Sequence, residues 1–114
     1  MKGFFNSFQY AFKGIRLVFS GRNFRIQFAL FVLAVCAGLY FHIARFEWLS
    51  IFALSALALG SEAINTSIEQ LCDLYSKEPH PKIERIKDMA AGGVLIICFF
   101  ALIGGILIFY KYFF

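Results

Sequence analysis

Acidic residues are absent from the first 46 positions of this 114-residue chain, and charge is scarce throughout. Charged residues make up 16% of the sequence, whereas 61% of the residues are hydrophobic and 16 are phenylalanine. Soluble domains carry about 25% charged residues, and a domain this small could not bury so much apolar surface. The composition excludes a soluble protein and predicts a small, all-α integral membrane protein with a single domain, 1–114.

Cysteine is also sparse. Cys36, Cys72 and Cys98 are odd in number and show no CxxC spacing, so they are expected to be packing residues and not disulfide partners or metal ligands. The apolar residues at the N-terminus are interrupted by polar ones, and no small-residue cleavage site follows. We therefore expect no cleaved signal peptide.

The cations that precede the first acid, Glu47, favour anionic lipid headgroups and the cytoplasmic side of a membrane. They include Lys2, Lys13, Arg16, Arg22 and Arg25. Nucleic acid is not expected as a partner, because these cations adjoin apolar segments and no nucleic-acid-reading module is visible.

Hydrophobic periodicity predicts four helices. Residues 2–20 carry a polar stripe opposite many phenylalanines, which is typical of an amphipathic helix on the membrane surface or of one packed under a bundle. Residues 26–44, 48–75 and 89–109 are each long enough to cross a bilayer. Residues 76–87, with both prolines, read as a polar loop. The cations place the N-terminus and this loop in the cytoplasm and the C-terminus outside.

The second span carries acids where a bilayer disfavours them. Glu62, Asn65, Glu69 and Asp73 fall on one helical face, and an ionisable group at mid-bilayer costs about 2.5–3.5 kcal/mol on insertion scales. Lys87 and Asp88 begin the third span at the same expected depth. Carboxylates with Mg²⁺ and a lysine are the usual equipment of phosphoryl transfer. The residues alone predict a multi-acid site at the cytoplasmic interface.

Each residue also has a simpler interpretation. Glu62 and Asn65 could join helices by hydrogen bonds, and Glu69 and Asp73 could be solvated residues at a helix end. Lys87 and Asp88 could be ordinary charges at a helix start, and His80 a loop residue. Their convergence at one depth favours a functional site.

The sequence resembles the small bacterial integral-membrane lipid kinases, the diacylglycerol kinase and undecaprenol kinase family. The resemblance rests on "EAINTSIE" (62–69), Asp73 and "KDMAAGGVLI" (87–96), with weaker support from "YAFKGIR" (10–16) and "NFRI" (23–26). It covers nearly the whole chain and implies a three-span subunit of a homotrimer in the bacterial cytoplasmic (inner) membrane. Active sites would be shared between neighbouring subunits.

By motif position, the resemblance implies that Glu62 is the general base and Glu69 a Mg²⁺ ligand. Asn65, Asp73, Lys87 and Asp88 would surround the metal and the ATP phosphates, with His80 on the nucleotide side. Many members place a second metal-binding glutamate where this chain has Gly21. The metal shell must then rely on Glu69 with water, Asp73 or Asp88, or the enzyme is slow or inactive.

The expected reaction is transfer of the γ-phosphoryl group of MgATP to a membrane lipid alcohol. The pattern is closer to the undecaprenol kinases, and diacylglycerol is the alternative substrate. A proton-coupled transporter subunit that uses Glu62 and Glu69 as a relay is a different class. The other two spans offer no partner acid or base for such a relay. A purely structural partner of a larger membrane complex would not need the acidic face.

Overall fold

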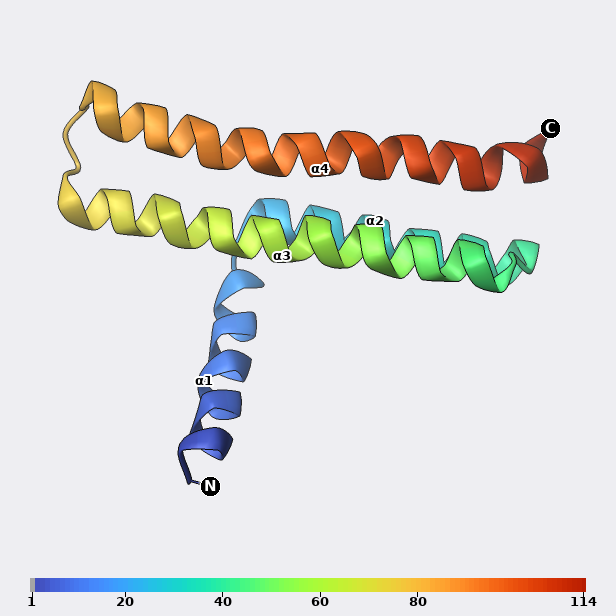
Figure 1. Cartoon of the computed structure of the whole chain (residues 1–114), viewed down its shortest axis with the longest axis horizontal. Coiled ribbons are helices and arrows are strands. Elements are labelled where there is room, and N and C mark those ends of the chain that lie inside the picture. Colours follow the sequence, from blue (N-terminus) through green and yellow to red (C-terminus); the bar gives the residue numbers. More distant parts are fainter. Residues whose placement is uncertain (1) are drawn as a thin grey trace.

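The computed structural model describes residues 2–114 and contains four helices over that range. They are α1 (Lys2–Val18), α2 (Arg22–Phe41), α3 (Arg45–Tyr75) and α4 (Pro81–Phe113). The last three lie along the long axis, where α3 runs antiparallel to α2 and α4 and packs against both (Figure 1). The all-helical prediction is confirmed.

Helices α2, α3 and α4 are each long and apolar enough to cross a membrane. With 31 and 33 residues, α3 and α4 extend over about 46 and 50 Å, which exceeds the ~30 Å hydrocarbon core. Their polar ends therefore extend beyond the apolar layer. The three predicted spans are confirmed as helices, although α2 begins and ends a few residues earlier than expected.

The turn between α2 and α3 is tight. His42 adopts a left-handed backbone conformation (φ 53°, ψ 54°), which ends α2 and reverses the chain within three residues. Gly38 allows close packing here, because a Cβ at this position would lie 2.7 Å from the ring of Trp48. The predicted antiparallel return is thus achieved by a glycine on α2 facing an aromatic ring on α3.

The polar loop predicted for residues 76–87 is shorter than expected. Only residues 76–80 lie outside helices, and α4 already begins at Pro81. Proline suits the first helical turn because its missing N–H needs no partner there. His80 caps the helix through Nδ1, which accepts a hydrogen bond from the Lys82 backbone N–H at 3.2 Å. The charged residues that suggested a loop therefore lie in the first turns of α4.

The apolar core lies at the end of the bundle formed by the α2–α3 turn and the C-terminal part of α4. Ile43, Ile51 and Ile108 form its buried centre. Partly buried aromatic and aliphatic residues surround it: Phe31, Ala34, Phe41, Trp48, Phe109 and Tyr112. The end near residues 76–80 has no comparable cluster among the described residues.

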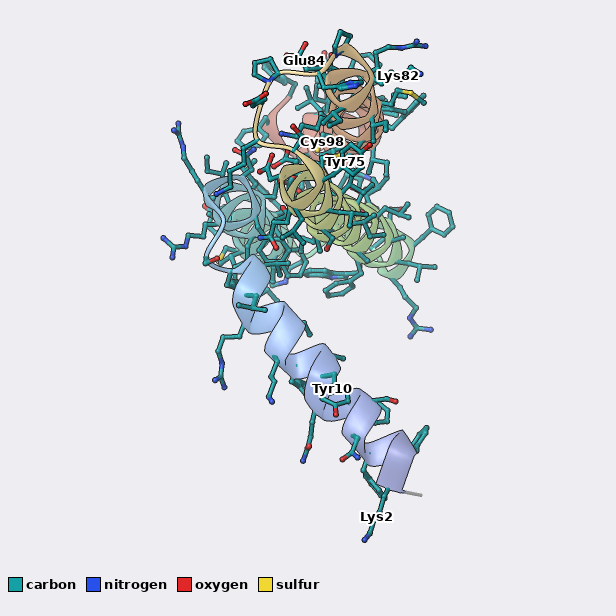
Figure 2. All side chains as sticks on the ribbon, turned by 90° about the vertical axis from the view of Figure 1, so that its left-hand side faces the viewer. Lys2, Tyr10, Tyr75, Lys82, Glu84 and Cys98 are labelled. Carbon is teal, nitrogen blue, oxygen red and sulfur yellow. The ribbon has the colours of Figure 1, made fainter. Side chains whose placement is uncertain are left out.

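Helix α1 projects at a steep angle from the three long helices (Figure 1). None of its residues is buried, and Phe4, Phe8 and Phe12 are more than half exposed. Lys2 and Tyr10 lie on this helix, away from the bundle (Figure 2). The helix predicted for residues 2–20 is present over Lys2–Val18, and its location on the membrane surface stays a prediction.

Candidate active site

The acidic face of α3 combines buried and exposed polar groups. Glu62 and Asn65 are only 6% and 5% exposed, which is unusual for polar side chains. Glu69 and Asp73 lie one and two turns further on and are exposed. These four residues, called the acidic row below, lead from the protein interior to the end of the helix.

Asn65 is the central member of this row. Its Nδ2 donates a hydrogen bond to Glu69 Oε1 at 3.2 Å. Its Oδ1 is buried and has no hydrogen-bond partner among the described residues. Buried polar oxygens in native proteins are usually paired, so this atom is a candidate contact for a ligand.

Helix α4 adds a cation to the row. Lys87 Nζ lies 2.6 Å from Asp73 Oδ1, which joins α4 to the polar end of α3. Both side chains are substantially exposed, at 35% and 56%. Exposed ion pairs contribute little to stability. The main effect of this pair is therefore to hold the Lys87 ammonium group beside the polar end of α3. Asp88 follows on α4 and is exposed, without a hydrogen bond among residues 2–114.

Gln27 on α2 is a candidate site residue that the sequence interpretation missed. Its Nε2 donates to Glu62 Oε2 at 3.4 Å, and its Oε1 is buried without a partner in the described part of the chain. One feature of the sequence could have pointed to Gln27: it is the sole amide or charged side chain of α2 after Arg25. Its contact with Glu62 crosses 35 residues of sequence, which no local pattern reveals.

A groove of about 690 Å³ begins at Gln27 and runs along α2, α3 and α4 toward the C-terminus. Its walls are almost entirely apolar. They are formed by Leu30, Phe31, Leu33, Ala34 and Ala37 of α2, Ser55, Ala58 and Leu59 of α3, and Cys98, Ala101, Leu102, Gly105, Ile106, Phe109, Tyr110 and Phe113 of α4. An apolar groove with one polar end suits a lipid with one polar group.

No three His, Cys, Asp or Glu side chains converge as a metal site within residues 2–114. Mg²⁺ does not need such a cage, because it is usually held by one or two carboxylates together with water and substrate phosphates. The unpaired Oδ1 of Asn65 and the exposed carboxylate of Glu69 are oxygen donors of the kind that Mg²⁺ prefers. These residues therefore fit a nucleotide-bound Mg²⁺.

Two other predicted positions lie at the edge of this arrangement. His80 is exposed and caps α4, and among residues 2–114 its side chain makes no hydrogen bond with the acidic row. Gly21 is the N-cap of α2 and has an ordinary extended backbone (φ −79°, ψ 138°). Along α2, Gly21 lies about 9 Å before Gln27. Along α3, Glu69 lies about 10 Å after Glu62, the residue that Gln27 contacts. Because α2 and α3 are antiparallel (Figure 1), these helical offsets place Gly21 and Glu69 on the same side of the Gln27–Glu62 contact.

Comparison with known proteins identifies the family of the chain. The family model described as prokaryotic diacylglycerol kinase matches residues 9–109. The chain is also 35% identical over 107 residues to the undecaprenol kinase of Bacillus subtilis (strain 168). That alignment covers 93% of this chain and 87% of the relative. The chain therefore belongs to the prokaryotic diacylglycerol kinase family and is a lipid kinase of the bacterial inner membrane.

Proposed function

We propose that this lipid kinase transfers the γ-phosphoryl group of MgATP to the hydroxyl of a membrane lipid alcohol, with undecaprenol favoured over diacylglycerol. The observation that carries the proposal is the row formed by Glu62, Asn65, Glu69 and Asp73. It leads from the polar end of an apolar groove to an exposed ion pair with Lys87. Such a row joins a membrane-soluble acceptor to a water-soluble donor.

In this mechanism Glu62 is the general base. The hydroxyl oxygen of the lipid attacks the γ-phosphorus, its proton passes to the Glu62 carboxylate, and the bond between the γ-phosphorus and the leaving ADP oxygen breaks. Burial of Glu62 next to the groove supports this role, because the base must meet the alcohol at the depth of the lipid headgroup.

The remaining polar residues hold the phosphate donor. Lys87 neutralises phosphate charge once the nucleotide competes with Asp73 for it. Asn65 and Glu69 would hold Mg²⁺, with Asp73 and Asp88 beside the metal and phosphates and His80 nearer the nucleotide. When bound, Mg²⁺ supplies charge neutralisation at the transferred phosphoryl group.

The preference for undecaprenol rests on sequence likeness. The relative named undecaprenol kinase supports it, and so does the local pattern of "NTSIE" and "KDMAAGGVLI". Diacylglycerol also presents a primary hydroxyl, so the polar residues of the site do not discriminate between the two lipids. We further propose a homotrimer with shared sites, a cytoplasmic N-terminus and an external C-terminus.

The proposal is tested by phosphoryl transfer from labelled ATP in mixed micelles with Mg²⁺. Undecaprenol and diacylglycerol are supplied side by side, and the labelled lipid products are separated and counted. We expect product from undecaprenol at the higher rate. A higher rate with diacylglycerol would overturn the lipid assignment, and no product from either lipid would overturn the choice of substrates.

The role of Glu62 is tested in the same assay with Glu62→Gln. This variant keeps the size of the side chain but removes the base, so turnover should fall by at least about a thousandfold while ATP binding is retained. Glu78→Gln is the matched control, because Glu78 lies in the loop between α3 and α4 and should leave the rate unchanged. Activity retained by Glu62→Gln would remove Glu62 as the base.

A further inference from the structure

Gln27 is the residue that connects the apolar groove with the acidic row. It lines the polar end of the groove, and its side-chain amide reaches Glu62 on the neighbouring helix. Glu62 itself is not part of the groove wall. A lipid hydroxyl that follows the groove to its polar end therefore meets Gln27 beside the carboxylate.

The contact leaves one oxygen of Glu62 free. Gln27 Nε2 donates to Oε2 at 3.4 Å, whereas none of the hydrogen bonds among residues 2–114 uses Oε1. A carboxylate held through one oxygen presents the other in a fixed direction. Catalytic groups need this kind of support, because small errors in the position of a base slow proton transfer.

Gln27 also keeps an unused acceptor. Its Oε1 is buried and has no partner among the described residues. A side chain that served only to join α2 to α3 would not need to leave a buried carbonyl oxygen unpaired, which costs free energy. Gln27 lines the polar end of the groove, so a hydroxyl group arriving there can reach the side chain and satisfy this oxygen.

We propose that Gln27 is a positioning residue for phosphoryl transfer: it fixes Glu62 through its N–H and receives the lipid hydroxyl on its free carbonyl oxygen. Rotation about the C–O bond of the alcohol then turns the hydroxyl proton from Gln27 Oε1 to the Glu62 carboxylate. Glu62 takes that proton as the hydroxyl oxygen bonds to phosphorus, and Gln27 keeps its own protons. This inference rests on the proposed function, because it assigns Gln27 a task in that reaction.

The test compares steady-state kinetics of folded, purified variants in mixed micelles. Gln27→Met keeps the side-chain volume but removes the donor and the acceptor. Gln27→Asn keeps the amide but withdraws it by one methylene, so that it no longer reaches Glu62. We expect kcat to fall about tenfold or more in both variants, with KM for MgATP within twofold of the wild type. Ile26→Met, on the exposed face of α2 at the same depth, is the matched control.

A merely structural role predicts a different result. If Gln27 only joined α2 to α3, folded Gln27→Met would retain its kcat, and this outcome would overturn the inference. Should Gln27→Met fail to fold, Gln27→Asn decides in the same way. Failure of the proposed function itself is distinguishable, because the wild-type chain would then form no phospholipid product from either alcohol.

Discussion

Burial separates the acidic row into two halves with different chemistry. Glu62 and Asn65 are almost fully covered. Asn65 and Gln27, the partner of Glu62, each keep a buried oxygen without a hydrogen-bond partner among the described residues. Glu69 and Asp73 are exposed, and Asp73 is paired with Lys87. Buried Glu62 suits the alcohol, the exposed half suits a hydrated phosphate donor, and Asn65 joins the two through its hydrogen bond to Glu69. This division follows from the depth of each residue along one helix.

Gly21 gives a direct test of the metal-binding half. Gly21→Glu would place a carboxylate at the depth of Glu69, and the extended backbone at Gly21 accepts any side chain. A Cβ here would lie 3.3 Å from the Val18 carbonyl oxygen, a tight contact that a small shift relieves. We expect the Mg²⁺ concentration for half-maximal activity to fall several-fold, because a second carboxylate strengthens oxygen coordination.

The control for this prediction is Gly21→Gln, which adds the same bulk without the charge. Both variants are titrated with Mg²⁺ at saturating ATP. An unchanged Mg²⁺ dependence in Gly21→Glu, with Gly21→Gln also unchanged, would mean that this position does not face the metal.

At the scale of elements, the spans were predictable and their contacts were not. The apolar runs and their lengths predicted α2, α3 and α4, because a bilayer imposes both composition and length on a helix. The start of α4 was missed, because the charges of residues 82–87 suggested a loop, whereas Pro81 and the His80 cap begin a helix. The polar face of α3 could be predicted from helical periodicity, but the Gln27–Glu62 contact depends on packing between helices.

The far end of the bundle contains a second contact of this kind. Glu47 accepts hydrogen bonds from Tyr112 Oη at 2.8 Å and from the Ala44 backbone N–H at 3.0 Å. Its other oxygen lies 2.8 Å from Lys111 Nζ. The carboxylate therefore fastens the C-terminal end of α4 to the start of α3, across 65 residues of sequence.

We expect Glu47→Ala to lower the thermal unfolding midpoint by several degrees in detergent micelles, because it removes a partner from three donors at once. The kcat of the folded enzyme should stay close to wild type, since Glu47 lies about 22 Å along α3 from Glu62. Unfolding is followed by circular dichroism, with Glu78→Ala as the control for loss of an exposed acid. An unchanged midpoint would show that the tie does not stabilise the bundle.

For the whole molecule, the uneven distribution of packing has a consequence for assembly. The buried apolar cluster lies at the end that contains Glu47, while α1 and the end near the active site have little cover from the rest of the chain. Many large apolar side chains are more than half exposed along all four helices. Lipid can cover those within the bilayer, but the acidic row, if it is the site of phosphoryl transfer, gains protection from water only from protein.

This requirement favours the proposed homotrimer, in which neighbouring chains cover the open end of each site. We expect the purified enzyme in mild detergent to have the mass of three 13.0-kDa chains by native mass spectrometry. Activity should disappear when harsher detergent separates the chains and return when they reassemble, because each site is completed by a neighbour. A monomer that retains full kcat would contradict this assembly and would mean that residues of one chain suffice to exclude water from the acidic row.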